Sequence, residues 1–519
     1  MPIWTLLTVC MTPVSPAPAS VSACMLTASD VHLLANNSEG LKLTEHCLKV
    51  IERVLDKVIR EIVDIAKFQF GFVPGRGTSD AIFIVRQLQE KYLAKERNLY
   101  FAFVDLEKAF DRVPCEVLWW AIRRVSIPEW IIRTVQAMYM NAKSMVRINN
   151  SYSKEFKVKV GVHQGSVISP LLFVIVLEVL SHDFSTGASW ERLYADDLVI
   201  VAETLEELSG KFLLWKNGLE LRGLRVNMAK MKVIISSPNL NSLRDSGKHP
   251  CGVCRKGVGC NSTFCNGCQH WVHKKCTRTR GRLSADPSFR CDHCLGLARP
   301  IVGKQFDQVS PAHSPHELET VDSFYHLGYH LCAGGGYELA SITRTRSAWK
   351  KFKELLPLLS SMALSCGTRG QVYSMYVRSV MLYASECWPI KKEDMKHLEH
   401  NERSMLRWMY HVNPSANIST EALRRSLGLT GLDTVLRLRR LRWFGHVKHS
   451  PHAINTIRCH QVVGMRKRGQ PRKTWEELVA SNLQAWGLQV EDALDRKCWK
   501  CALHNFHAPS DTPQVSHRR

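Results

Sequence analysis

Residues 193–201 read Leu-Tyr-Ala-Asp-Asp-Leu-Val-Ile-Val, so two adjacent acidic residues interrupt an otherwise apolar run. Short apolar stretches on either side of a polar pair are typical of two strands joined by a tight turn. A second apolar and aromatic run, residues 99–104, ends directly in Asp105. The sequence therefore predicts that Asp105, Asp196 and Asp197 lie at the ends of strands.

Carboxylates at strand ends that face a cleft are suited to binding divalent cations. Mg²⁺ prefers hard oxygen ligands and keeps room in its coordination shell for water and substrate phosphate. Two such ions about 3.5–4 Å apart can activate an attacking hydroxyl group and stabilise the leaving oxygen in phosphoryl transfer. Each aspartate taken alone could instead be a turn residue or a helix cap. The surrounding motifs therefore decide between a metal ligand and these structural roles.

Further elements are predicted around these strands. Apolar side chains recur at helical spacing between Leu43 and Ile62, which predicts one amphipathic helix over residues 39–66. Residues 236–250 are polar and turn-rich and mark a predicted boundary. The remaining predicted elements are helices over 79–95, after Pro114, over 205–223 and through most of 339–445, and a strand over 158–162.

Composition and charge indicate the class of partner. The chain has 519 residues, which corresponds to about three domains at roughly 150 residues each. Its 70 Lys and Arg residues outnumber its 47 Asp and Glu residues, and the formal net charge is +23. A globular protein this basic indicates a polyanionic partner, with nucleic acid as the leading candidate, although ribosome-like and membrane-surface proteins share such a balance. The longest apolar stretch, Val167–Leu180, contains Ser169, Pro170 and Glu178, so we expect no membrane-spanning helix.

Cysteines cluster in one part of the chain. Eight of the 18 cysteines lie between residues 251 and 294, together with histidines, which favours metal binding in a reducing compartment over disulfides. Tetrahedral zinc takes four thiolate or imidazole ligands, and a Cys-x-x-Cys pair places two thiolates on one turn. Four close pairs supply eight ligands and predict two structural zinc sites: Cys251 and Cys254, Cys265 and Cys268, His273 and Cys276, and Cys291 and Cys294.

Several words in the chain have the order and spacing found in a known family. Residues 103–114, Phe-Val-Asp-Leu-Glu-Lys-Ala-Phe-Asp-Arg-Val-Pro, resemble motif A of reverse transcriptases, and Tyr-Ala-Asp-Asp at 194–197 resembles motif C. Over roughly residues 40–480 the pattern resembles most closely the polymerases of non-LTR (LINE-type) retrotransposons. The other matching words are motif B at 164–170, motif D at 223–230, motif E (the primer grip) at 324–328, and the fingers word Gln-Phe-Gly-Phe-Val-Pro-Gly at 69–75.

The resemblance implies a two-metal polymerase site. Asp105 and Asp196 would ligate Mg²⁺ or Mn²⁺, and Asp197 would be the second carboxylate of the hairpin. The substrates would be deoxynucleoside triphosphates, added to a primer 3′-hydroxyl group.

Four further positions match nucleotide-binding residues of the family. The ring of Phe110 would clash with a ribose 2′-hydroxyl group, and Gln164 and Gly165 would line the nucleotide and template side of the pocket. Lys230 would neutralise or protonate the leaving pyrophosphate. A solvated surface lysine is the alternative for Lys230, because Lys232 is equally available.

The order of the zinc ligands resembles that of a plant-homeodomain (PHD) finger, in which the pairs interleave. Basic residues surround the ligands, so the finger is expected to bind nucleic acid, with a histone tail as the alternative. The resemblance implies two ligand sets: Cys251, Cys254, His273 and Cys276 for one zinc ion, and Cys265, Cys268, Cys291 and Cys294 for the other.

The implied fold class is α+β, a right-hand polymerase of fingers, palm and thumb with an inserted two-zinc cross-brace finger and a mainly helical C-terminal region. An N-terminal truncation is expected, because the endonuclease of such elements has no room before residue 39. The expected division is a disordered leader (1–38), partial fingers (39–102), palm with motifs A–D (103–240), PHD-like finger (246–296), the primer-grip part of the palm (318–336), helical thumb (337–445) and basic C-terminal tail (446–519).

Two functions from different classes follow. The first is an RNA-directed DNA polymerase of a LINE-type element, with an RNA template and a DNA primer or target as partners. The alternative is a catalytically decayed or co-opted protein that binds nucleic acid or chromatin, favoured by Glu39 where the family carries an arginine that would contact the triphosphate. A nuclear location with a cytoplasmic ribonucleoprotein stage is expected for either. Near the end of the thumb, the expected contacts are Arg437, Arg439, Arg440 and Arg442 to phosphates and Trp443 and Phe444 to bases.

Overall fold

The computed structural model describes residues 46–65, 69–140, 142–144, 147–148, 151–184, 191–238, 319–413, 416–450, 453–464 and 473–505. Between residues 239 and 318 it describes Val253, 262–265, 270–277, 289–291 and Cys294. The expectations for the leader (1–38), Glu39 and the zinc ligands Cys251, Cys254 and Cys268 therefore fall outside the described residues.

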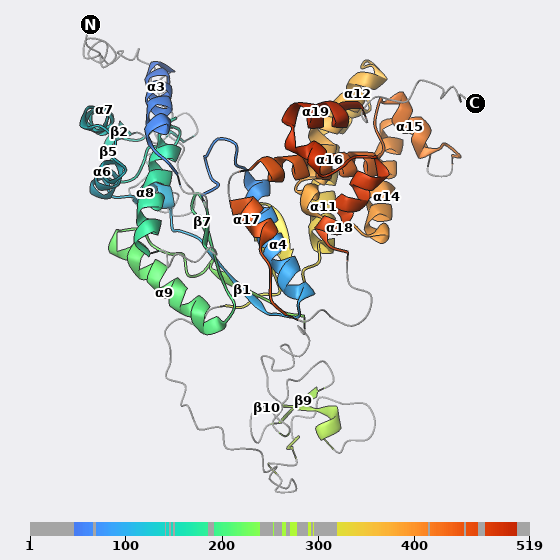
Figure 1. Cartoon of the computed structure of the whole chain (residues 1–519), viewed down its shortest axis with the longest axis horizontal. Coiled ribbons are helices and arrows are strands. Elements are labelled where there is room, and N and C mark those ends of the chain that lie inside the picture. Colours follow the sequence, from blue (N-terminus) through green and yellow to red (C-terminus); the bar gives the residue numbers. More distant parts are fainter. Residues whose placement is uncertain are drawn as a thin grey trace.

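A four-stranded antiparallel sheet occupies the middle of the molecule (Figure 1). The register pairs Val104 with Leu198 on one side of β1 and Phe103 with Lys232 on the other, so β1 is an inner strand. Both predicted strand regions are confirmed, because the run at 99–104 and the acidic hairpin at 193–201 form three of the four strands. The strand order is β6 (Glu191–Tyr194), β7 (Asp197–Ala202), β1 (Leu99–Val104) and β8 (Lys232–Ser236).

The two faces of this sheet pack into two different hydrophobic cores, because successive side chains of a strand point to opposite faces. Ala102 and Val104 join one core, whereas Phe101 and Phe103 join the other. In Figure 1 the helices of the first core lie on one side of β1 and β7. They are α3 (His46–Ile62), α5 (Ala109–Arg112), α6 (Cys115–Arg124), α7 (Glu129–Tyr139), α8 (Ser169–Phe184) and α9 (Leu205–Leu221).

The second core contains α4 (Thr78–Ala94) and the C-terminal helices (Figure 1). The expected helical character of residues 339–445 is confirmed. Residues 446–505, expected as a basic tail, carry three further helices whose Trp475 and Trp499 are buried in this core. The C-terminal helices are α11 (Glu338–Leu359), α12 (Cys366–Val372), α13 (Ser379–Met381), α14 (Lys392–Met409), α15 (Thr420–Ser426), α16 (Leu432–His449), α17 (Ala453–Cys459), α18 (Trp475–Ala485) and α19 (Arg496–Asn505).

The chain returns to the sheet after the cysteine-rich segment. Val321 donates to the carbonyl oxygen of Val233 in β8 (2.8 Å), and a hairpin of β11 (Ser323–His326) and β12 (Tyr329–Cys332) follows. Its two turn residues, Leu327 and Gly328, both have positive φ, as a tight two-residue hairpin turn requires. Phe324 of this hairpin stacks on Phe103 of β1, with ring centroids 4.6 Å apart. The predicted primer-grip word therefore lies against the central strand.

One prediction of local structure is wrong and a second is only partly right. Residues 158–162 do not form a strand; the neighbouring β5 (Phe156–Lys157) pairs instead with β2 (Lys143–Ser144). The expected apolar stripe of the first helix is only partly right: Leu55 and Ile59 are buried, but Val50 and Val54 are each 60% exposed while Glu52 on the same helix is 2% exposed.

The apolar stretch Val167–Leu180 supplies most of α8, and its side chains fill the first core. None of the helices in the described part of the chain is both long and apolar enough to cross a bilayer.

Candidate active site

The three predicted catalytic aspartates meet at one end of the central sheet. Asp105 and Asp197 each lie one residue beyond the register pair Val104–Leu198 on neighbouring strands. Asp196 occupies the turn between β6 and β7, where Tyr194 pairs with Asp197. The structure therefore places side by side residues that are ninety positions apart in the chain.

Negative charge is concentrated at this turn. Burial, together with the charges of Asp196 and Asp105, raises the pKa of Asp197 to about 7, and Lys230 opposes the shift. The Lys230 ammonium group lies 3.1 Å from Oδ2 of Asp105, and its side chain is 68% exposed. A group of carboxylates that repel one another and draw in a cation has the charge and the hard oxygen donors that Mg²⁺ or Mn²⁺ requires.

Residues 69–75, the fingers word, contact the turn that carries Asp196. The sequence did not predict this contact. The side-chain oxygen of Gln69 accepts hydrogen bonds from the backbone N–H of Gly71 (2.9 Å) and of Ala195 (3.1 Å). Ala195 has a left-handed backbone (φ 53°), and a Cβ on Gly71 would clash with its backbone nitrogen. Gln69 is fully buried, so this contact fixes the turn that carries Asp196.

A second unpredicted residue, Glu52 of α3, holds the motif B loop. Its carboxylate accepts hydrogen bonds from the hydroxyl group of Ser166 (2.7 Å) and the backbone N–H of Val167 (2.7 Å). Gln164 lies just before these residues, and its side-chain nitrogen is buried without a hydrogen-bond partner in the described part of the chain. An unsatisfied buried donor is costly unless a ligand completes it. The one sequence signal for Glu52 is a charged residue inside an apolar helical pattern.

Two further residues predicted for the nucleotide site, Phe110 and Gly165, have well-defined conformations. The ring of Phe110 stacks on Phe173 (centroids 4.5 Å apart) and meets the edge of Phe72 (6.3 Å), so its position is fixed. Gly165 is exposed and has φ +94°, a backbone conformation that suits glycine.

Motif D is joined to motif A by backbone hydrogen bonds. The N–H of Asn227 donates to the carbonyl oxygen of Asp105 (2.8 Å), and that of Glu107 donates to the carbonyl oxygen of Arg225 (2.9 Å). These bonds bring Lys230 to the aspartates, whereas Lys232 points to Glu319 in an ion pair. The sequence offered both Lys230 and Lys232 for the role at the pyrophosphate. In the described part of the chain, only Lys230 contacts one of the three predicted catalytic aspartates.

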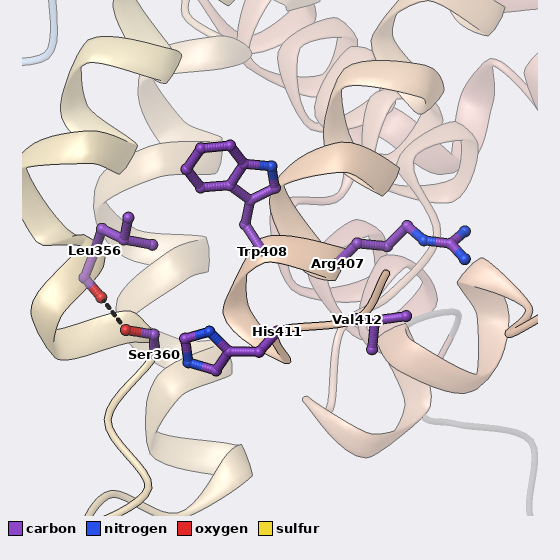
Figure 2. Close-up of a pocket in the computed structure, with 6 residues that line it drawn as sticks. All are labelled: Leu356, Ser360, Arg407, Trp408, His411 and Val412. Atoms are coloured by element: carbon purple, nitrogen blue, oxygen red, sulfur yellow. Dashed lines mark hydrogen bonds between the residues drawn. The ribbon is translucent and has the colours of Figure 1, made fainter. Parts of the chain in front are cut away.

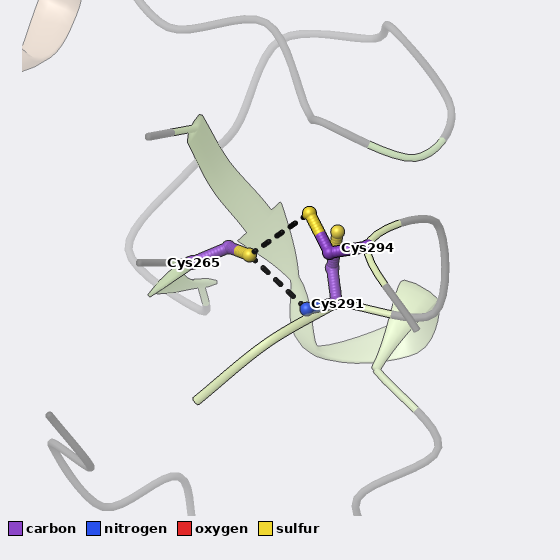
Figure 3. Close-up of side chains that lie close together, drawn as sticks. All are labelled: Cys265, Cys291 and Cys294. Atoms are coloured by element: carbon purple, nitrogen blue, oxygen red, sulfur yellow. Dashed lines mark hydrogen bonds between the residues drawn. The ribbon is translucent and has the colours of Figure 1, made fainter. Parts of the chain in front are cut away.

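Three of the predicted zinc ligands form a tight group (Figure 3). The sulfur atoms of Cys265, Cys291 and Cys294 lie within 4.8 Å of one another, and those of Cys265 and Cys294 are 3.8 Å apart. These are described members of one interleaved ligand set. From the other set, Cys276 Sγ lies 3.9 Å from Nδ1 of His273. In the described part of the chain, the cysteine trio is the only group of three possible ligands this close together, so the three aspartates are more widely spaced.

The expected phosphate contacts near the end of the thumb are partly wrong. Arg440 is 5% exposed, donates to the carbonyl oxygen of Trp388 (3.3 Å), and has its pKa lowered to about 10 by burial. Arg439 donates to the carbonyl oxygen of Leu382 (2.7 Å). Phe444 is buried as well, so these side chains stabilise the helical core, and Arg442 remains exposed.

A small cavity of about 340 Å³ in the thumb does not resemble a catalytic site (Figure 2). The half-exposed Trp408 lies above it, and Ser360 on its wall donates to the carbonyl oxygen of Leu356 (2.7 Å). The guanidinium group of Arg407 is bound by the carbonyl oxygens of Asn413 and Ala416. It is therefore held by backbone groups of its own neighbourhood.

Residues 40–279 match the family described as reverse transcriptase (RNA-dependent DNA polymerase). The chain is 27% identical over 207 residues to the retrovirus-related Pol polyprotein from type-1 retrotransposable element R2 of Nasonia vitripennis, covering 38% of this chain and 20% of that protein. It is 31% identical over 173 residues to the corresponding polyprotein of element R2DM of Drosophila melanogaster, covering 31% and 16%. It is 28% identical over 165 residues to the RNA-directed DNA polymerase from mobile element jockey of Drosophila funebris, covering 30% and 18%. The matched segments thus span at most a fifth of these relatives.

Among solved structures, the chain is similar to telomerase from Candida tropicalis in complex with a fragment of telomeric RNA. The identity is 14%, the match covers 83% of this chain and 59% of that chain, and the TM-score is 0.31.

Proposed function

We propose that this chain acts as an RNA-directed DNA polymerase of a LINE-type mobile element, because residues 40–279 match the reverse transcriptase family. The observation that carries the proposal is the meeting of Asp105 with the Asp196–Asp197 turn at the end of the central sheet. The relatives that match this domain, which come from retrotransposable elements, support it.

The chemistry is nucleotidyl transfer. A primer 3′-hydroxyl oxygen bonds to the α-phosphorus of a deoxynucleoside triphosphate, and the bond from that phosphorus to the pyrophosphate oxygen breaks. Divalent ions held by Asp105, Asp196 and Asp197 would supply activation of the hydroxyl group and stabilisation of the developing charge. Lys230 lies at the same place and would offer its positive charge to the leaving pyrophosphate.

Substrate selection would rest on the residues around the aspartates. The fixed ring of Phe110 would close the space beside the sugar and exclude a 2′-hydroxyl group. The amide nitrogen of Gln164, which has no hydrogen-bond partner among the described residues, would donate to the incoming nucleotide or the template. The RNA template and the DNA primer are part of this proposal.

Primer extension on an RNA template, with Mg²⁺ or Mn²⁺, tests the function. We expect incorporation by the parent protein and a loss of ~100-fold or more in Asp196→Asn, because the variant lacks one charged ligand of the metal ions that stabilise the transition state. Asp183→Asn, an exposed aspartate on α8, is the matched control and should retain the parent rate. If the folded parent protein extends no primer, the polymerase proposal fails.

The second candidate, a binding protein that keeps the polymerase scaffold, is favoured by two observations. The ammonium group of Lys230 lies against Asp105, where a metal ion would bind. The carboxylate oxygens of the three aspartates are also farther apart than the sulfur atoms of Cys265, Cys291 and Cys294. Under this alternative the parent protein would bind nucleic acid or chromatin and give no extension, so the same assay separates the two.

The cysteine-rich segment would hold two structural zinc ions. Four sulfur atoms about 2.3 Å from a tetrahedral zinc ion lie about 3.8 Å from one another, which is the separation of Cys265 and Cys294. Cys291, with Cys268 from the same predicted set, would complete that site. We expect such a finger to bind nucleic acid in the nucleus, with chromatin as a further partner.

A further inference from the structure

A cavity of about 750 Å³ lies at the C-terminal end of α16, between that helix, α19 and the fingers word. We call it the α16–α19 cavity. Apart from Pro74 and Gly75 of the fingers word, its lining residues lie outside the quoted polymerase motifs. Its walls are formed by Pro74, Gly75, Arg442, Gly445, His446, His449, Ser450, Arg496, Trp499, Lys500, Leu503 and His504.

The rim of this cavity is cationic. Arg442 on α16, and Arg496 and Lys500 one turn apart on α19, are all exposed. Among the described residues, no aspartate or glutamate lines the cavity. The nearby Asp495 is not a lining residue; its carboxylate accepts the backbone N–H groups of Lys497 (2.7 Å) and Cys498 at the start of α19. Three positive charges without acidic partners on the wall form a site for an anion.

The floor of the cavity is apolar and tightly built. Trp499 is 4% exposed and Leu503 is 3% exposed. The indole ring lies directly against Gly445, where a Cβ would clash with it. The indole N–H has no hydrogen-bond partner in the described part of the chain. An apolar floor beneath a cationic rim suits a ligand that has phosphates and also less polar sugar and base groups.

The α16–α19 cavity is connected to the catalytic turn by one segment. Pro74 and Gly75 line the cavity, and Gln69 of the same segment holds the backbone of Ala195. On the cavity side, His446 is bonded to the buried carboxylate of Asp80 (2.7 Å), which ties α16 to the start of α4. A strand held in the cavity would therefore lie beside the segment that supports the active site.

We propose that the α16–α19 cavity binds single-stranded nucleic acid through its phosphates. A strand with one charge per nucleotide matches the three cations, and a base and sugar fit a cavity of this volume. A duplex presents its phosphates on a broad rigid surface that cannot enter it. The site is separate from the three aspartates, so it needs no catalysis to be tested.

The test is binding of a labelled single-stranded RNA oligonucleotide to the full chain, measured by fluorescence anisotropy without Mg²⁺ or nucleotides. The variant is Arg496→Glu with Lys500→Glu. The matched control is Arg53→Glu with Lys57→Glu on α3, which has the same residue types at the same spacing, both exposed. Unchanged thermal unfolding would show that each variant is folded.

We expect the α19 variant to bind at least tenfold more weakly than the parent and control proteins. Its salt dependence should also be weaker, with a log–log slope smaller by about 0.7 for each phosphate of a single strand that the variant no longer neutralises. Affinity within twofold of the parent, or equal weakening in the control, would overturn the proposal. So would equal weakening for a duplex of the same sequence.

A competition experiment separates a strand from a free phosphate compound. Unlabelled oligonucleotide should displace the label at far lower concentration than inorganic pyrophosphate does. If pyrophosphate competes equally well, the site takes free phosphates and the proposal is wrong. Because no extension is measured, an inactive polymerase would leave this result unaffected.

Discussion

Asp197 is buried beside two other carboxylates, and its pKa is raised to about 7 from the ordinary 3.8. Since the folded protein favours the protonated acid below that pH, a proton must leave before a cation can bind. We expect the apparent affinity for Mg²⁺ to fall by about tenfold for each pH unit below 7 and to level off above it. Calorimetric titration of the metal between pH 6 and 8.5 measures this.

The control for this pH dependence is Asp197→Asn, which carries no titrating group. Its weaker metal affinity should be nearly flat over the same pH range. An affinity of the parent protein that does not change between pH 6 and 7 would contradict the assignment of the raised pKa to a metal ligand.

Gln69 holds the turn that carries Asp196, because its side-chain oxygen accepts the backbone N–H of Ala195. Gln69→Ala leaves the N–H groups of Gly71 and Ala195 buried without their acceptor, which costs about 1–3 kcal/mol. We expect a lower free energy of unfolding in urea, and a lower extension rate because the turn that carries Asp196 loosens. Gln484→Ala, at an exposed position on α18, should stay within about 0.5 kcal/mol of the parent. Equal stability of both variants would show that the contact is not needed.

At the scale of elements, α3 is tied to the loop before α8 by one buried carboxylate. Glu52→Ala removes the acceptor of Ser166 and Val167, and we expect a loss of about 1–3 kcal/mol together with a higher KM for nucleotide. Ser166→Ala removes one of the two bonds and should cost less. Unfolding curves and steady-state extension measure both quantities; a Glu52→Ala variant with the parent KM would contradict the role in positioning the loop.

The thumb contains a buried ion triad that joins three elements. Glu402 of α14 is fully buried and pairs with Arg378 (2.6 Å) and with Arg424 of α15 (2.8 Å). Glu402→Gln removes the counter-charge of the buried Arg378 and the nearer of the two carboxylates that pair with Arg424, the other being Glu421 (3.6 Å), which is expected to cost about 3–5 kcal/mol. Glu399→Gln on the same helix is the control and should change stability little. A small change in Glu402→Gln, measured by denaturant unfolding, would contradict this account of the thumb.

Across the molecule as a whole, the sheet separates two cores, and the cysteine-rich segment is inserted between β8 and β11. The N–H of Val321 donates to the carbonyl oxygen of Val233, so the chain that follows the insert returns directly to β8. We expect chelation to release about two zinc ions per chain and to expose residues 251–294 to protease, while the polymerase core stays resistant. Metal analysis combined with limited proteolysis measures both effects.

Cysteine variants test the same prediction without a chelator. Cys291→Ser should lower the zinc content, whereas Cys459→Ser, at an exposed cysteine outside the insert, should leave it unchanged. Unfolding of the palm after zinc loss would contradict the independence of the insert, and a zinc-free parent protein would refute the finger.

Features that depend on neighbours along the chain could be predicted from the amino-acid order. The strand before Asp105, the acidic hairpin at 193–201 and most helix positions follow from local apolar periodicity, and the cysteine pairs follow from their spacing. The expected clustering of the aspartates followed from motif order and is matched by the register of β1 with β7.

Only the tertiary structure shows which polar side chains are buried and which groups they bond to. Gln69 reaches Ala195 across 126 positions, Glu52 is buried while Val50 and Val54 on the same helix are exposed, and Arg440 lies inside the core. Periodicity treats each charged side chain as a surface group. A buried polar group is stable only because a distant segment supplies its hydrogen-bond partner, and that partner does not exist until the chain has folded.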